Sequence, residues 1–73
     1  MTFSQAVLGL RESLHLTQIS FAKELGVSYT SVNRWENNAQ KPSPLAIKML
    51  KAYCKERGLA FMYQEEVLVQ DKE

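Results

Sequence analysis

The stretch QISFAKELGVSYTSVNRWEN, residues 18–37, decides the fold of this chain. Its apolar residues recur at three- and four-residue intervals on both sides of Gly26, which is the spacing of two short amphipathic helices joined by a tight turn. Helices joined so closely cross steeply, so their closest approach requires a small side chain, which Ala22 supplies, and the turn requires the positive φ that Gly26 adopts readily. The positions expected to point inward are all apolar: Phe21, Leu25, Val27, Val32 and Trp35.

Capping residues predict how these helices begin and where a helix precedes them. Thr17 and Ser28 are the expected N-cap residues of the two central helices. An earlier helix is expected from an N-cap at Ser4 to an end near Ser13. It carries apolar residues at helical spacing, namely Val7, Leu10 and Leu14.

A fourth helix is expected between Ser43, its N-cap, and Gly58, its C-terminal stop. Pro44 then occupies the first helical position, where proline is best tolerated. The buried face is predicted to contain Leu45, Met49, Leu50 and Tyr53. The solvated face is predicted to contain Lys48, Lys51 and Lys55. Residues 1–60 are therefore predicted to form one compact all-α domain of four to five helices.

Residues 61–73 differ in character from this helical domain. A two-residue alternation, typical of a short β-strand, runs through Phe61, Tyr63, Val67 and Val69. Because a strand needs a pairing partner, two interpretations stay open. The segment is either a disordered tail or a short C-terminal strand that pairs with the same strand of a second copy.

The charge is distributed unevenly along the chain. The formal net charge is only +1, but residues 1–63 hold eight of the nine lysines and arginines against four glutamates, a balance of +4. Residues 64–73 are acidic and mask this basic body in the overall sum. The helical part of the chain is thus compatible with a nucleic-acid partner.

Composition excludes several other classes of protein. A chain of 73 residues has room for one modest core, and it has neither an apolar run of about 20 residues nor the pattern of a signal peptide. The single cysteine, Cys54, is expected to be a buried thiol in a reducing compartment, so we expect a soluble, cytoplasmic protein without a membrane partner. His15 and Cys54 are far apart and give neither a nucleophilic pair nor a metal site. We therefore expect no enzyme, metal or cofactor.

The chain resembles the Cro/C1-type (XRE family) helix-turn-helix regulators. The resemblance spans about residues 5–58 and lies in Leu16-Thr17-Gln18, Phe21-Ala22, Leu25-Gly26-Val27-Ser28, Val32, Trp35-Glu36-Asn37 and Lys41-Pro42-Ser43. It implies a lambda-repressor-like domain in which the helix from about Ser28 to Asn37 reads the major groove of double-stranded DNA. It further implies a homodimer on a palindromic operator and, in many members, repression of transcription.

The resemblance also implies roles for particular residues. Base contacts are expected from Tyr29, Thr30 and Arg34, with Ser28 and Asn33 at the margins. Phosphate contacts are expected from Gln18, Ser31, Asn37, Asn38 and Lys41. Arg11 and Glu36 are expected to form a structural ion pair.

Some features depart from the family or permit another interpretation. Ile19 and Ser20 stand where the family commonly has acidic residues, so the capping box at Thr17 is expected to be incomplete. The alternative to base contact for Tyr29 and Arg34 is that they belong to an ordinary solvated helix face without a binding role. The alternative function is a DNA-binding antitoxin-type module that also binds a protein partner through its C-terminal tail.

Overall fold

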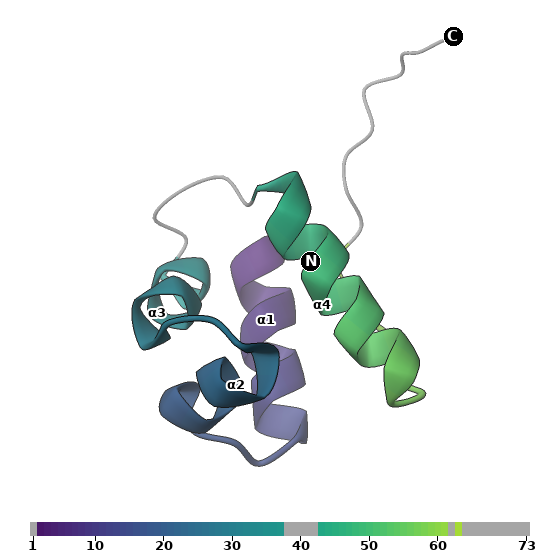
Figure 1. Cartoon of the computed structure of the whole chain (residues 1–73), viewed down its shortest axis with the longest axis horizontal. Coiled ribbons are helices and arrows are strands. Elements are labelled where there is room, and N and C mark those ends of the chain that lie inside the picture. Colours follow the sequence, from purple (N-terminus) through teal and green to yellow (C-terminus); the bar gives the residue numbers. More distant parts are fainter. Residues whose placement is uncertain (1, 38–42, 62, 64–73) are drawn as a thin grey trace, which may run out of the picture.

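The computed structural model describes residues 2–37, 43–61 and 63. It contains four helices: α1 (Phe3–Ser13), α2 (Gln18–Leu25), α3 (Tyr29–Glu36) and α4 (Pro44–Glu56). In Figure 1, α1 lies between the α2–α3 pair on one side and α4 on the other. The predicted all-α class is confirmed, and no strand occurs among the described residues. Within this part of the chain no helix is both long and apolar enough to span a membrane.

Three of the four predicted N-caps are confirmed. The hydroxyl groups of Thr17, Ser28 and Ser43 accept the backbone N–H three residues on, at 3.0–3.1 Å. The cap of α1 was wrongly predicted, because Thr2 and not Ser4 fills that position. The physical reason is a capping box: Gln5 donates its N–H to Thr2 Oγ1 at 3.1 Å, and its side chain accepts the Thr2 N–H at 3.0 Å.

The predicted helix ends are also present. α2 stops at Gly26, whose φ of 75° is left-handed, and the N–H of Val27 then donates to the carbonyl of Ala22 at 3.0 Å. α3 is capped at its C-terminus by Asn37, and α4 by Arg57, one residue before Gly58.

The four helices enclose one apolar core. Phe21 of α2, Val32 of α3, Leu50 of α4 and Val7 of α1 are fully buried. Ala22 is 3% exposed, as expected for the close approach of α2 and α3. Leu25, Val27 and Trp35 are only partly buried and pack against the outside of this core.

The buried face of α4 differs from the prediction. Leu50 and Tyr53 are buried as expected, but Leu45 was wrongly assigned and is 69% exposed, while Met49 is half-buried. The face that enters the core contains Ala46, Ile47, Leu50, Tyr53 and Cys54. Because α4 has apolar residues on both sides, spacing alone did not select the side that meets α1 and α2. The lysines Lys48, Lys51 and Lys55 are exposed, as predicted.

Residues beyond α4 return to the core. Phe61 and Tyr63 both meet Phe3 of α1 in edge-to-face contacts, with ring centroids 6.2 and 5.4 Å apart. Trp35 meets Phe3 in the same way at 6.1 Å, so this indole is part of the packing. Of the expected strand residues, Val67 and Val69 lie outside the described residues.

Cys54 is buried as predicted, with 1% of its surface exposed. Burial raises the pKa of its thiol, because an apolar environment disfavours the thiolate. The thiol therefore acts as a small apolar group of the core.

Two leucines of α4 provide a test of this core. Leu50→Ala is expected to lower the free energy of unfolding by about 2–5 kcal/mol, because the side chain is fully buried. Leu45→Ala, on the exposed side of the same helix, is expected to change it by no more than about 0.5 kcal/mol. Urea denaturation followed by circular dichroism measures both, and equal losses would contradict the assignment of the two faces.

Candidate nucleic-acid interface

An ion pair joins the end of α3 to α1. Nε of Arg11 donates to Oε2 of Glu36 at 2.6 Å, and Nη2 donates to Oε1 at 3.0 Å. The two side chains are only 17% and 6% exposed. The hydrogen bond to Glu36 raises the pKa of Arg11 above its already high ordinary value, so the guanidinium stays charged. The two residues expected to pair therefore do meet, in bidentate geometry.

The same arginine also positions the loop before α2. Nη1 of Arg11 donates to the carbonyl oxygen of Leu16 at 2.9 Å, immediately before the N-cap Thr17. In this loop His15 has a φ of 58°, a left-handed conformation that a non-glycine residue adopts at a tight reversal. The start of α2 is thereby held against α1.

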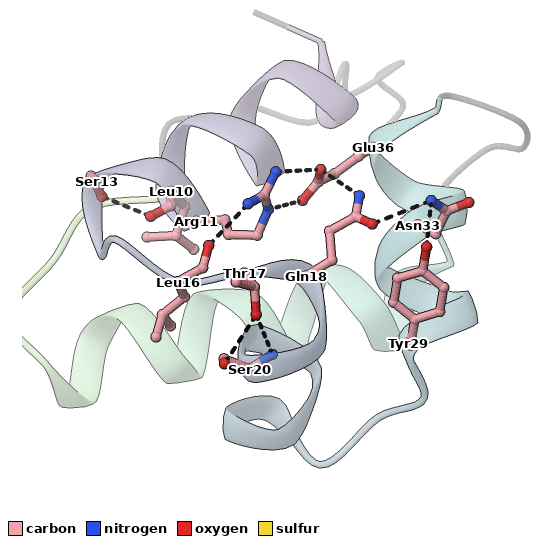
Figure 2. Close-up of polar contacts among 10 residues, drawn as sticks. All are labelled: Leu10, Arg11, Ser13, Leu16, Thr17, Gln18, Ser20, Tyr29, Asn33 and Glu36. Atoms are coloured by element: carbon pink, nitrogen blue, oxygen red, sulfur yellow. Dashed lines mark hydrogen bonds and ion pairs between the residues drawn. The ribbon is translucent and has the colours of Figure 1, made fainter.

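Gln18, the first residue of α2, extends the ion pair into a hydrogen-bonded chain (Figure 2). Its Nε2 donates to Oε1 of Glu36 at 2.9 Å. Its Oε1 accepts a hydrogen bond from Nδ2 of Asn33 at 3.3 Å. Sequence reasoning assigned Gln18 to DNA alone and missed these two bonds, because the residues they join are 18 and 15 positions apart.

Asn33 connects these hydrogen bonds to two further residues, Tyr29 of α3 and its C-cap Asn37. Its Nδ2 makes a long contact of 3.5 Å with the hydroxyl oxygen of Tyr29. Its Oδ1 accepts a hydrogen bond from Nδ2 of Asn37 at 2.9 Å. The Asn33 amide thus has partners within the protein at both its nitrogen and its oxygen.

The residues expected to contact bases lie on the outer side of α3. Tyr29 is 48% exposed, Thr30 and Arg34 are exposed, and Val32 faces the core. Arg34 makes no hydrogen bond or ion pair with any residue that the structure describes. Ser28 is exposed and Ser31 half-buried, and their hydroxyl groups bond each other at 3.1 Å. The outer side of α3 therefore presents one unpaired cation beside aromatic and hydroxyl groups.

The expected phosphate-contacting residues are only partly described. Gln18 is half-buried and Asn37 exposed, whereas Asn38 and Lys41 lie outside the described residues. No acidic residue stands in the first turn of α2 or α3 itself, although the Glu36 carboxylate reaches the start of α2 through its hydrogen bond with the Gln18 side chain. Ser20 does not complete a capping box, because its hydroxyl accepts a hydrogen bond from Thr17 at 3.0 Å. Ile19 is 58% exposed beside this helix end.

Two short helices around a glycine turn, with a polar outer face on the second, define a helix-turn-helix domain. A family model described as helix-turn-helix matches residues 9–55, more than half of the chain. The chain belongs to this family, which comprises the Cro/C1-type (XRE) regulators, and it is a DNA-binding helix-turn-helix protein. No curated protein and no solved structure shows significant similarity to it.

The ion pair can be tested by removing one partner. Arg11→Ala is expected to lower the free energy of unfolding by about 3 kcal/mol, which is the lower end of the range for a buried ion pair. The reason is that the Glu36 carboxylate, only 6% exposed, loses its counter-charge. The neighbouring Glu12 is exposed, so Glu12→Ala serves as the control, with an expected change within about 0.5 kcal/mol. Thermal and urea unfolding measure both variants. A loss for Arg11→Ala no larger than the control would show that the pair contributes no net stability.

Proposed function

We propose that the protein is a sequence-specific transcriptional regulator that reads the major groove with α3 and represses transcription by occupying a promoter. The observation that supports this most directly is the unpaired Arg34, exposed on the same side of α3 as Tyr29 and Thr30. A surface arginine that has no acidic partner among the described residues is available for an anionic or acceptor-rich ligand. The positive balance of residues 1–63 favours the same partner.

The chemistry of these three side chains suits base recognition. Arg34 has the planar fork that pairs with O6 and N7 of guanine. The methyl group of Thr30 and the ring of Tyr29 are suited to apolar contact with the thymine methyl group. Ser28 is placed in the proposal at the margin of this surface.

Phosphate contacts are proposed for residues around the ends of α2 and α3. Gln18 stands at the N-terminus of α2, where free backbone N–H groups and the helix dipole favour an anion. Ser31, Asn37, Asn38 and Lys41 complete the proposed set. Such contacts orient the domain on the duplex without specifying its sequence.

Selection on randomised duplexes tests this division of roles. Arg34→Ala is expected to weaken binding to the selected duplex by about 1–3 kcal/mol and to relax the preference at one base position. Gln18→Ala is expected to weaken binding to all duplexes alike, since a phosphate carries no sequence information. Fluorescence anisotropy on matched duplexes measures both variants. Failure of the selection to enrich any motif would contradict sequence-specific binding.

We further propose a homodimer on a palindromic operator. In helix-turn-helix dimers the two recognition helices read half-sites about 34–36 Å apart, one turn of DNA. The apolar residues available for self-association include the exposed Leu45 and, in the tail, Val67 and Val69. The packing of Phe61 and Tyr63 on Phe3 favours a boundary between domain and tail after Tyr63, three residues beyond the boundary predicted from the sequence.

Deletion of residues 64–73 tests the role of the tail. The truncated chain is expected to self-associate less, because it lacks the apolar segment proposed to pair between copies. A deletion from residue 61 would also remove the two rings that pack on Phe3, so it would confound association with folding. Sedimentation equilibrium of the full and truncated chains measures the effect. An unchanged association constant would refute the proposed role.

The alternative, an antitoxin-type module, adds a protein partner to the same DNA-binding function. The exposed Leu45 is the observation that favours it, since an isolated apolar side chain at the start of α4 is suited to a protein contact. Co-expression with the product of the adjacent gene, followed by purification of a stoichiometric complex, would distinguish this function from that of a plain repressor.

A further inference from the structure

The two bonds made by Gln18 limit what its side chain can offer to DNA. Its nitrogen is bonded to Glu36 at 2.9 Å and its oxygen to Asn33 at 3.3 Å, as Figure 2 shows. A glutamine amide nitrogen carries two protons. One N–H of Gln18 therefore has no hydrogen-bond partner among the residues that the structure describes.

The carboxylate of Glu36 determines which way the side-chain amides of Gln18 and Asn33 are turned. An ionised carboxylate only accepts hydrogen bonds, so Gln18 must turn its nitrogen towards Glu36 and its oxygen away. That oxygen requires a donor, which is Nδ2 of Asn33, and Oδ1 of Asn33 in turn accepts from Asn37. Reversing the Gln18 amide would break the bonds to both Glu36 and Asn33.

This direction matters for a phosphate, which is an anion and only accepts hydrogen bonds. In the observed orientation Gln18 retains an N–H for a phosphate oxygen. In the reversed orientation its single amide oxygen would face the Glu36 carboxylate, and two acceptors would meet without a proton between them. Asn33 and Glu36 thus hold Gln18 from two sides in the orientation that suits its proposed contact.

We propose that Asn33 is a positioning residue for DNA binding, which holds the Gln18 amide in this orientation and does not itself read a base. The inference rests on the proposed function, in which Gln18 contacts a phosphate. It departs from the marginal base contact expected for Asn33 from the family resemblance. The Asn33 nitrogen lies within hydrogen-bonding distance of Gln18 at 3.3 Å and, more weakly, of Tyr29 at 3.5 Å, and its oxygen accepts from Asn37 at 2.9 Å, so both ends of the amide already have partners within the protein.

A double-mutant cycle between Asn33 and Gln18 tests this role. Asn33→Ala, Gln18→Ala and the double variant are compared with the unchanged chain by anisotropy on the selected duplex and on duplexes altered at each base pair. Asn33→Ala is expected to weaken binding to all of them about threefold to tenfold, the effect of one well-oriented hydrogen bond. In the Gln18→Ala background the same change is expected to weaken binding less than about twofold, because the residue it positions is gone.

Arg34 provides the matched control on the same helix. Since Arg34 shares no hydrogen bond with the chain of amides, the losses caused by Asn33→Ala and Arg34→Ala are expected to add. Circular dichroism establishes that each variant keeps its helices. Coupling of Asn33 to Arg34 as strong as its coupling to Gln18 would indicate a general distortion of α3 and overturn the inference.

The remaining outcomes separate this inference from the proposed function. If Asn33→Ala changes the preference at one base pair, Asn33 reads a base; if its loss adds fully to that of Gln18→Ala, Asn33 acts independently of Gln18. Either result overturns the inference alone. The inference also fails alone if Gln18→Ala weakens binding and Asn33→Ala does not. If Gln18→Ala has no effect, the proposed phosphate contact fails, and the positioning role fails with it.

Discussion

The ion pair between Arg11 and Glu36 is the interaction on which the arrangement of the DNA-binding surface depends. Arg11 lies on α1 and Glu36 at the end of α3, and Arg11 also bonds the carbonyl oxygen of Leu16 just before α2. One guanidinium thus connects α1 with the end of α3 and with the loop that leads into α2. Because charges are costly to bury unless they are paired and hydrogen-bonded, any displacement of α1 from α3 would leave Arg11 or Glu36 partly unsatisfied.

The apolar core and this polar junction contribute in different ways. The core supplies the free energy of folding, but apolar contacts are not directional and tolerate small rotations of a helix. The bonds from Arg11 to Glu36, and from Glu36 to Gln18, are directional and define the position of α2 against α3 more narrowly. In a domain of this size, where the core is modest, such a junction is an effective way to maintain one orientation of α3 relative to α2.

The junction also links stability with function. The Glu36 carboxylate that neutralises Arg11 is the one that accepts a hydrogen bond from Gln18, and Gln18 stands at the helix end proposed for a phosphate. A chain of amides then passes from Gln18 to Asn33 and Asn37 on α3. In this arrangement the proposed phosphate-contacting and base-contacting surfaces share one partly buried anchor, so their relative geometry is already defined in the free protein.

Features that arise from local interactions follow from the amino-acid sequence alone. Thr17, Ser28 and Ser43 cap their helices, and Gly26 ends α2, because each acts on backbone groups only a few residues away. The cap at Thr2 is also local, but it depends on a capping box with Gln5, whereas residue type alone equally favours Ser4.

Where the sequence offers several equivalent local patterns, the packing of the helices selects the one that is used. It selected Ile47 and not Leu45 for the core, because α4 carries apolar residues on two sides and the choice lies with the helices it meets. It brought Phe61 and Tyr63 to Phe3, and it joined Gln18 to Glu36 and Asn33. These contacts join residues distant in sequence, and no spacing rule encodes them, because they depend on the packing of whole helices.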